Sequence, residues 1–359
     1  MLEIRRFLLA ITTACNLKCD YCFVKDTQEF ISIEKAKKWI LFFLNSAGKD
    51  KLLYLYGGEP LIYFDFIKKI VPFFYQSARK INKRASIIIV TNGTIFNKKI
   101  GELIKKYQLK IMISLSGQKK SHDLFRHFKN GKGTFNMIGK NLKKFLKVVS
   151  TENLWVSYTL HPKMLKNFHS DLFYLINLGF ENLHIEPVQY TLRVYWTNNE
   201  IRKFSQVIKN FFSYLEEKIN QNQFLFISKL IRNLEISLKI APKNEFYYNI
   251  YNNLRVWPPS KLTFCHFAPN ILKKQLSRKK LFEKVILENG EKMNLKKLQR
   301  IFLALKEIET KGPRYFSAGE KIWKVYNQLC EELAQKIILK SQKNKLYKEY
   351  IKKALERAI

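Results

Sequence analysis

The sequence has few cysteines, no long apolar run and few acidic residues. Its five cysteines, three of them close together, do not form the pattern of a disulfide framework. No stretch reaches the roughly 18 consecutive apolar residues that a membrane-spanning helix needs. We also find no export signal, no internal repeat and no low-complexity linker. These absences exclude a disulfide-stapled scaffold and a membrane-spanning protein, and they make the cytoplasm the expected compartment.

The chain holds 29 acidic residues against 65 Lys and Arg, a formal net charge of +36. A charge of this size attracts polyanions such as nucleic acid or an acidic peptide. It also fits a compositional bias, because Lys, Ile, Asn, Phe and Tyr are all abundant, as in AT-rich genomes. The basic residues are spread along the whole chain, and the local cluster at 273–280 is typical of a solvated surface, which favours the compositional explanation. The share of hydrophobic residues, 47%, is that of a globular protein.

The most informative stretch is a short loop with Cys15, Cys19 and Cys22 in the spacing C-x3-C-x2-C. The loop directly follows the apolar run 7–11, so a strand is expected to deliver three thiolates at its C-terminal end. Such a donor set suits a soft metal or an iron–sulfur cluster. Because a four-iron cluster takes one ligand per iron, three cysteines leave one iron open, where a small molecule can bind.

Other uses of these cysteines fit less well. A zinc knuckle needs a fourth ligand nearby, but the next cysteine is Cys265 and the first histidine is His122. A lipoprotein signal peptide needs a longer apolar stretch than the one that Thr12 and Thr13 interrupt. A single disulfide cannot use three thiols. The loop is therefore predicted to bind an iron–sulfur cluster.

The first half of the chain alternates apolar runs with amphipathic stretches, as βα units do. This alternation predicts an α/β fold, a partial (β/α)6 TIM-like barrel over residues 1–195 with its chemistry at the C-terminal strand ends. The predicted strands are 6–12, 52–56, 86–90, 110–115, 154–160 and 182–188, and the helices between them are 32–45, 63–82, 97–107, 133–149 and 168–178. Residues 196–359 are predicted as a mostly helical, basic C-terminal region, irregular at 241–292, with helices at 198–220, 223–240, 294–309, 320–340 and 342–358.

A glycine-rich turn follows the second predicted strand. Gly57 and Gly58 let the backbone approach a ligand closely, and Glu59 can pair with an ammonium group. Together with the cysteine spacing, this Gly-Gly-Glu-Pro turn resembles the GGEP motif of radical S-adenosylmethionine (SAM) enzymes. The resemblance implies that the open iron chelates SAM, that one-electron reduction cleaves SAM to a 5′-deoxyadenosyl radical, and that the turn binds the amino group of SAM. Phe23 resembles the aromatic residue that lies near the adenine in this family.

The block from Ser114 to Arg126 resembles the SxDG…HDxxR pattern of the anaerobic sulfatase maturases and peptide maturases. This resemblance implies that Ser114 contacts the SAM ribose and that Arg126 pairs with the SAM carboxylate, whose geometry suits a guanidinium fork. The sequence departs from the pattern at Ser116, where relatives have Asp. His122 and Asp123 are expected to brace the loop rather than to act in catalysis.

Two strand-end features have weaker signals. Residues 91–94, Thr-Asn-Gly-Thr, resemble the family's TNG turn, which shapes the pocket floor, but an ordinary Asn-Gly turn explains them nearly as well. Glu186, at the end of the sixth predicted strand, is expected to contact the ribose or the substrate. A structural salt bridge is an equally good explanation of this carboxylate.

Beyond residue 195 the resemblance ends. SPASM-type maturases carry a cysteine-rich C-terminal domain, whereas only Cys265 and Cys330 remain here, so we expect one [4Fe–4S] cluster and SAM as the cofactors. The resemblance implies a peptide or protein substrate and an electron donor such as flavodoxin or ferredoxin. Two alternatives are a radical SAM enzyme that modifies RNA, which the charge favours, and a non-enzymatic iron–sulfur protein. No catalytic acid, base or radical-relay residue is assigned.

Overall fold

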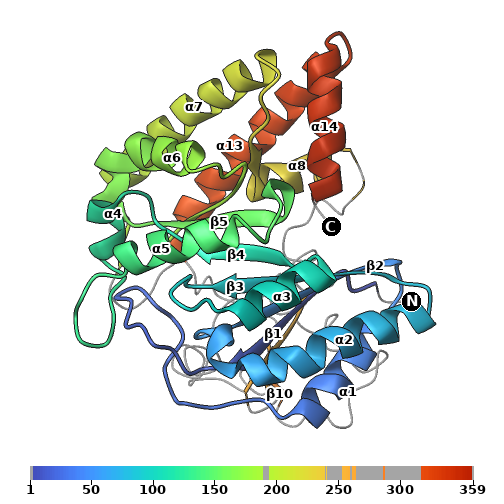
Figure 1. The fold of residues 1–359 in the computed structure, drawn as a ribbon. Helices are drawn as coiled ribbons and strands as arrows, with labels where there is room; N and C mark the ends of the chain where they lie inside the picture. Colours follow the sequence, from blue (N-terminus) through green and yellow to red (C-terminus); the bar gives the residue numbers. More distant parts are fainter. Residues whose placement is uncertain are drawn as a thin grey trace.

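The computed structural model describes residues 3–188, 194–238, 240, 253–258, 261–263, 286–287 and 317–357. They form an α/β fold in which β-strands alternate with helices around one sheet (Figure 1). Cys265 and the predicted helix 294–309 lie outside the described residues.

The sheet has ten strands in the order β10-β9-β8-β1-β2-β3-β4-β5-β6-β7. Strands β1 to β7 follow one another in the sheet as they do in the chain, and each pairs with the next in parallel. All their C-terminal ends therefore meet at one edge. The strands are β1 (Arg6–Thr12), β2 (Asp50–Gly57), β3 (Arg84–Thr91), β4 (Lys110–Ser114), β5 (Leu154–Leu160), β6 (Asn182–Pro187), β7 (Phe226–Ile227), β8 (Asn253–Trp257), β9 (Lys261–Thr263) and β10 (Ile286–Leu287).

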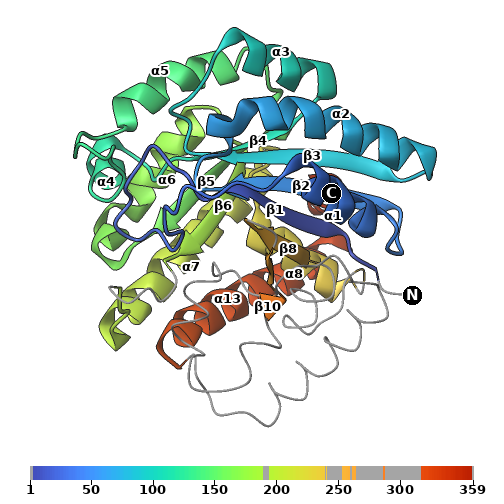
Figure 2. The same cartoon turned by 90° about the horizontal axis from the view of Figure 1, so that it is seen from below.

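Helices connect the strands and cover both faces of the sheet. Figure 2 shows α2, α3 and α5 on one face, and α8 and α13 on the opposite side. Short 3-10 helices η1 (Pro60–Tyr63), η2 (Thr151–Asn153) and η3 (Pro162–Asn167) complete the connections. The α-helices are α1 (Ile33–Leu44), α2 (Phe64–Lys80), α3 (Lys98–Tyr107), α4 (Lys119–Asp123), α5 (Phe135–Phe145), α6 (Phe168–Asn177), α7 (Asn198–Asn220), α8 (Ser228–Ser237), α13 (Ser317–Ser341) and α14 (Lys345–Arg357).

Local sequence explains where several helices begin. The Ser32 side chain accepts a hydrogen bond from Lys35 N and caps α1, as the sequence predicted. Asn97 caps α3 in the same way. Thr197 and Glu200 form a full capping box at the start of α7. These caps fix the points at which the chain leaves each strand-end loop.

The six predicted strands and the α/β barrel architecture are confirmed, with strand ends shifted by at most a few residues. Two segments differ from their predictions. Residues 241–292 were expected to be irregular, but the described strands β8, β9 and β10 lie within this range and join the sheet beside β1. The stretch 223–240 was expected to be a single helix, but Phe226–Ile227 form β7 beside β6 before α8 begins. One aromatic and one β-branched residue, Phe226 and Ile227, suffice to pair with the edge of β6. A strand of two residues is too short to show the alternating pattern that distinguishes strands from helices in a sequence. The sheet therefore continues beyond residue 195, and the proposed boundary there stays a prediction.

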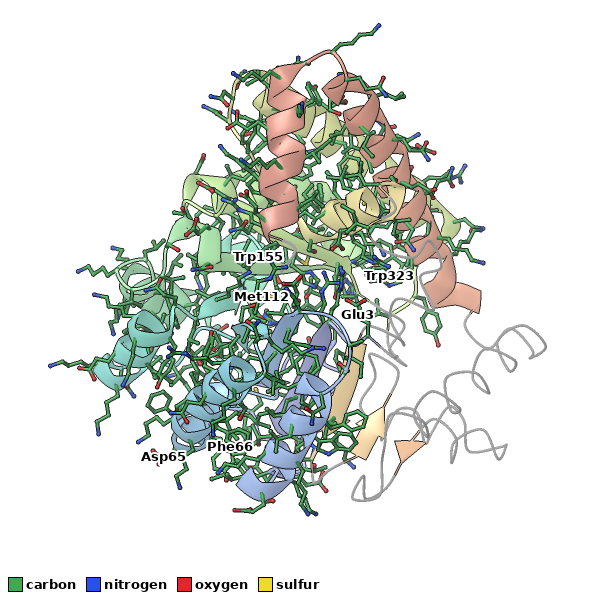
Figure 3. The ribbon with its side chains drawn as sticks, turned by 90° about the vertical axis from the view of Figure 1, so that its right-hand side faces the viewer. Glu3, Asp65, Phe66, Met112, Trp155 and Trp323 are labelled. Atoms are coloured by element: carbon green, nitrogen blue, oxygen red, sulfur yellow. The ribbon has the colours of Figure 1, made fainter. Side chains whose placement is uncertain are left out.

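The C-terminal helices pack on the barrel rather than apart from it. Lys336 and Lys340 Nζ contact the Glu216 carboxylate of α7 at 2.7 and 2.9 Å. Tyr350 Oη donates to Leu225 O at 3.0 Å. Figure 3 shows Met112 and Trp155, register partners on β4 and β5, between the helices of the first half and the C-terminal helices. Within the described residues, no helix has the length and apolarity to cross a bilayer.

Candidate functional site

The three cysteines lie on the loop that follows β1, at the C-terminal edge of the sheet. Cys15 Sγ accepts a hydrogen bond from Leu17 N at 3.4 Å, and Cys22 N donates to Cys19 O at 3.1 Å. Burial raises the pKa of Cys15 to about 12, and the negative charges of Glu59 and the other two thiols add to this shift. The thiols are thus near enough to influence one another electrostatically.

The spacing of these thiols matters for the kind of metal group they fit. Within the described part of the chain, no three His, Cys, Asp or Glu side chains converge into a site for one metal ion. In a four-iron cluster each cysteine binds a different iron, so its ligands stand farther apart than those of a single ion. The three thiols of the loop can thus supply one ligand each to three of the four irons of such a cluster.

A buried arginine supplies the positive charge of the site. Arg126 is only 8% exposed, and its Nη1 donates to Tyr21 Oη at 3.4 Å. Its Nε is buried and makes no hydrogen bond in the described structure. Burial alone would lower the pKa of Arg126, but Tyr21 and the three cysteines, when ionised, raise it above its ordinary value. The buried guanidinium of Arg126, with its unused Nε–H donor, suits a negatively charged group that is bound by the three thiolates.

The glycine turn packs against the cysteine loop. A Cβ on Gly57 would lie 2.0 Å from Thr12 O, and one on Gly58 would lie 2.2 Å from Ala14 O. Gly57 also has a φ of +139°, which side chains rarely adopt. Gly58 N donates to Thr12 O at 2.9 Å. The close approach that the sequence predicted for a ligand is made here to the backbone of the cysteine loop.

Glu59 is fully buried, and protein donors occupy its carboxylate. Oε1 accepts from Leu61 N at 3.0 Å and from Thr91 Oγ1 at 2.8 Å, and Oε2 accepts from Asn92 N at 2.7 Å. Burial raises the pKa of Glu59 to about 7. The side chain thereby joins the end of β2 to the end of β3, and its predicted pairing with an ammonium group stays a prediction.

The turn after β3 is tied to the cysteine loop as well. Asn92 Nδ2 donates to Asn16 Oδ1 at 2.8 Å and lies 3.9 Å from Cys15 Sγ. Asn16 Nδ2 donates in turn to Thr94 Oγ1 at 2.9 Å. Sequence reasoning missed Asn16, whose only signal is its position directly after Cys15. The Thr-Asn-Gly-Thr turn therefore holds the cysteine loop in place, besides reversing the chain direction.

A histidine connects the end of β4 to Arg126. Ser116 N donates to His122 Nδ1 at 3.1 Å, and His122 Nε2 lies 2.9 Å from Thr134 Oγ1. Thr134 Oγ1 donates to Arg126 O at 3.1 Å. The chain of donors requires a neutral imidazole with its proton on Nε2, and burial lowers the pKa of His122 well below its ordinary value. Thr134 was missed as part of this network, because a helix-start threonine is common.

Asp123 braces the same block. Its Oδ1 accepts from Phe135 N at 2.9 Å, at the start of α5, and its Oδ2 accepts from Lys119 Nζ at 2.6 Å. The bracing role expected for His122 and Asp123 therefore matches their contacts. Ser114 lies half-buried at the end of β4, beside its register partner Ser157.

Phe23 and Glu186 lie at other parts of this edge. Phe23 packs against Ala10, on β1, together with the half-buried Tyr56 of β2. Glu186 Oε1 is 3.1 Å from His184 Nε2, which is the salt bridge that the sequence left open. His184 was not singled out from the sequence, and no spacing signal marks it.

His184 has a second partner. Its Nδ1 lies 2.7 Å from Ser228 Oγ at the start of α8. Burial lowers the pKa of His184, but Glu186 outweighs burial and raises it above its ordinary value. Ser228, His184 and Glu186 thus form one polar row across β6 and α8. Cys330, by contrast, is a buried cysteine on α13.

Comparison with known proteins decides the family. A sequence model of the Radical SAM superfamily matches residues 9–170, a range that contains the cysteine loop, the glycine turn and Arg126. Residues 9–170 therefore form a radical SAM domain. Such a domain implies a [4Fe–4S] cluster and SAM as cofactors. The buried Arg126 and the three-thiol loop fit that pair of groups.

Individual relatives match parts of the chain. The cysteine-type anaerobic sulfatase-maturating enzyme of Clostridium novyi is 35% identical over 139 residues, 36% of this chain and 37% of that one. A GTP 3′,8-cyclase of Clostridium perfringens is 30% identical over 188 residues, 50% of this chain and 53% of that one. The chain thus spans between about a third and a half of the curated relatives it matches.

A solved structure extends the likeness in fold. Native anSMEcpe with bound AdoMet and the Cp18Cys peptide superposes with a TM-score of 0.72 over 92% of this chain and 99% of that chain. Its sequence identity is 16%, so this likeness concerns the fold alone. The fold similarity therefore reaches into the C-terminal half of the chain.

Proposed function

We propose that this protein is a radical SAM enzyme that abstracts hydrogen from a peptide or protein substrate. When bound, the cluster supplies the electron that cleaves SAM to methionine and a 5′-deoxyadenosyl radical. Cys15, Cys19 and Cys22 hold the cluster. The cytoplasm is the proposed compartment, because such a cluster needs reducing surroundings.

Arg126 is the observation that carries this proposal. Its guanidinium lies buried beside Tyr21 and within electrostatic reach of all three cysteines, and its Nε still has a hydrogen bond to donate. A carboxylate of bound SAM would use that donor, and a charge-assisted bond of this kind is worth about 1.5–3 kcal/mol. In this proposal Arg126 orients SAM against the open iron.

The other contacts to SAM follow from the same geometry. Because the Glu59 carboxylate already accepts three hydrogen bonds, the turn of Gly57, Gly58 and Glu59 would receive the amino group through its main-chain atoms. Ser114 would contact the ribose and Phe23 the adenine. Glu186 would contact the ribose or the substrate from the opposite side of the sheet edge.

The substrate class rests on the relatives and on the Ser114–Arg126 block. One curated relative is a sulfatase-maturating enzyme, and the structure with the same fold was solved with a peptide. A bound peptide would find an apolar side on β2, formed by the half-buried Tyr54 and Tyr56. It would find a polar side on β5, formed by the half-buried Ser157 and Thr159. An RNA substrate, the alternative that the charge suggests, would bind with a steep dependence on salt.

The central test is SAM cleavage. The protein is reconstituted anaerobically with iron and sulfide, reduced with dithionite and given SAM, and 5′-deoxyadenosine is measured. We expect 5′-deoxyadenosine from the unmodified protein and none from the variant with Cys15, Cys19 and Cys22 changed to Ala, which should also lose its iron. Equal iron content in the two proteins, with no 5′-deoxyadenosine from either, would overturn the proposal.

A further inference from the structure

Three polar side chains form a continuous row between β6 and the start of α8. Ser228 Oγ lies 2.7 Å from His184 Nδ1, and His184 Nε2 lies 3.1 Å from Glu186 Oε1. Both distances fall in the range of about 2.6–3.2 Å that joins a nucleophile to its base and the base to a third, orienting group. The row therefore has the connectivity of a Ser–His–Glu triad, which is recognised by geometry and not by sequence position.

The fold places the serine at a junction that suits a nucleophile. Ser228 directly follows β7 and is the first residue of α8, so it stands where a strand turns into a helix. Hydrolases with a nucleophile elbow carry their serine at a strand-to-helix turn of this kind. The glycines of that motif are absent around Ser228, so the likeness is one of position in the fold. Ser228 is half-buried, and a small reagent can therefore approach it.

The start of α8 supplies hydrogen-bond donors beside this serine. Its N-cap residue is Ile227, whose side chain makes no cap hydrogen bond. The first N–H groups of a helix have no acceptor within the helix, and they favour negative charge. When a serine attacks a carbonyl carbon, the carbonyl oxygen becomes negative, and the N–H of the residue after the nucleophile is a usual donor to it. In this chain that residue is Lys229.

The sheet orients the base and its carboxylate. His184 and Glu186 are two residues apart on β6, so their side chains point to the same face, while Leu183 and Ile185 are buried on the other. The side chains of His184 and Glu186 keep 27% and 38% of their surface exposed, so a small molecule can reach them. Burial lowers the pKa of His184, but Glu186 outweighs burial and raises it. A carboxylate that stabilises the imidazolium is what a proton-accepting histidine needs.

We propose that Ser228, His184 and Glu186 form a second catalytic site, which hydrolyses a carboxylic ester through an acyl-serine. Ser228 Oγ forms a bond to the carbonyl carbon while its proton passes to His184 Nδ1. The ester C–O bond then breaks, and the leaving oxygen takes that proton. Water repeats the two steps on the acyl-serine, which releases the acid and restores the serine. Glu186 accepts from His184 Nε2–H throughout. No electron is exchanged, so this inference is independent of the proposed function.

The test uses the full-length, reconstituted protein and the probe diisopropyl fluorophosphate. An activated serine attacks the phosphorus of this probe, the P–F bond breaks, and fluoride leaves. Peptide mass spectrometry locates the label, and hydrolysis of para-nitrophenyl acetate measures turnover. Ser228→Ala removes the nucleophile and His184→Gln removes the base. Ser237→Ala, which changes another half-buried serine at the opposite end of α8, is the matched control.

We expect the label on Ser228 in the unmodified and Ser237→Ala proteins. His184→Gln should slow labelling by about 100-fold or more, because a positioned general base contributes about 10²–10⁴-fold. Circular dichroism checks that this variant folds. Glu186→Gln keeps the base and should slow labelling by about ten-fold or more, because it loses the orienting carboxylate. Dithionite-driven formation of 5′-deoxyadenosine should be equal in the unmodified and Ser228→Ala proteins, which separates this inference from the proposed function.

Three results would overturn the second site. An unlabelled Ser228 in the folded, unmodified protein would show that its hydroxyl is not activated and that the row only holds β6 to α8. Equal labelling rates in the unmodified protein and in both the His184→Gln and Glu186→Gln variants would show that the row plays no part in the reaction. Unchanged ester hydrolysis in Ser228→Ala would place any turnover elsewhere in the protein.

Discussion

The Glu59 carboxylate accepts a hydrogen bond from the backbone N–H of Asn92 at 2.7 Å, which locks the end of β2 to the end of β3. Leu61 N and Thr91 Oγ1 donate to the other oxygen. Two neighbouring strand-end motifs that look independent in the sequence are therefore one structural unit. The cysteine loop rests on this unit through Asn16 and the backbone of Ala14.

Changing Glu59 to Gln should therefore destabilise the protein more than it weakens SAM binding. The amide would point N–H groups at the Asn92 N–H, and a buried unsatisfied group costs about 1–3 kcal/mol. Because burial raises the pKa of Glu59 to about 7, the folded state binds an extra proton between the unfolded value of 4.5 and 7. Wild-type stability should thus fall as pH rises through this window and then level off.

Urea unfolding of both proteins at pH 5 and pH 8 measures this effect. The gap in unfolding free energy between wild type and Glu59→Gln should be larger at pH 5 than at pH 8. A variant of unchanged stability whose SAM affinity has collapsed would mean that the carboxylate binds the ammonium group directly, against the contacts described above.

Arg126→Met should weaken SAM binding about 10–100-fold, the loss expected when one charge-assisted hydrogen bond of about 1.5–3 kcal/mol is removed. The methionine keeps the length and apolar character that burial requires. Arg202→Met, on the exposed face of α7, is the matched control and should bind SAM like the wild type. Equilibrium binding of labelled SAM to the reconstituted proteins provides the measurement. Equal affinities in the two variants would remove Arg126 from the proposed pocket.

Gly58→Ala should disturb the cysteine loop. The new Cβ would lie 2.2 Å from Ala14 O, a backbone atom that cannot move without shifting the loop. Gly139→Ala, on α5, meets nothing within 4 Å and serves as the control. We expect the Gly58 variant to lose about 2 kcal/mol or more of stability, in the range of backbone clashes at buried sites, and to retain clearly less iron after reconstitution. Iron analysis and thermal unfolding of both variants check this, and a Gly58 variant with full iron content would contradict it.

The sequence predicted the barrel strands and the three-cysteine loop well because both leave strong local signals. Apolar runs mark strands, and C-x3-C-x2-C has few structural explanations. What it could not predict were side-chain contacts across sequence distances, such as Asn16 with Thr94 or His122 with Thr134. Asn, Thr and His have many ordinary uses in loops, so only the fold shows which of them meet.

The same limit applies to strands too short to have a period. The two residues of β7 gave no signal of their own, and the helical pattern around them concealed the strand. Glu186 was recognised as polar at a strand end, but its partner His184 lies two residues earlier on the same strand, where an inward-facing histidine is ambiguous. Sequence could offer the salt bridge only as one of two explanations.

The pair of His184 and Glu186 predicts a pH-dependent stability. Because the carboxylate raises the pKa of His184 in the folded state, the pair stabilises the fold fully below the unfolded value of 6.5 and loses that contribution as pH rises through the folded pKa. Glu186→Gln should therefore cost more stability at pH 5.5 than at pH 8.5. Glu181→Gln, which breaks the Arg357 contact at 3.1 Å, is the control, since no histidine titrates there. A difference between wild type and Glu186→Gln that stays constant with pH would show that the pair is not ionic.

Lys51 offers the sharpest test of the packing beneath the site. Its side chain is fully buried at the start of β2, and its Nζ donates to Ile4 O, Ser46 O, Ser46 Oγ and Ala47 O over 2.6–3.1 Å. Lys51→Met keeps the apolar stem but leaves these acceptors without a donor, so we expect a loss of about 3 kcal/mol, since buried unsatisfied groups cost about 1–3 kcal/mol each and some will relax.

The pH dependence of the Lys51 variant separates the charge from the packing. Burial lowers the pKa of Lys51 to about 7, so the folded state binds fewer protons than the unfolded state between 7 and 10.5, and wild-type stability should rise with pH in that window. The methionine variant lacks this rise, and its deficit should therefore grow from pH 7 to pH 9.5. Lys68→Met, on the exposed part of α2, removes a surface pair with Asp65 and a cation–π contact with Phe64, and it should change stability by less than about 1 kcal/mol. Equal deficits for the two lysine variants in urea unfolding would mean that the four acceptors around Lys51 are satisfied by water.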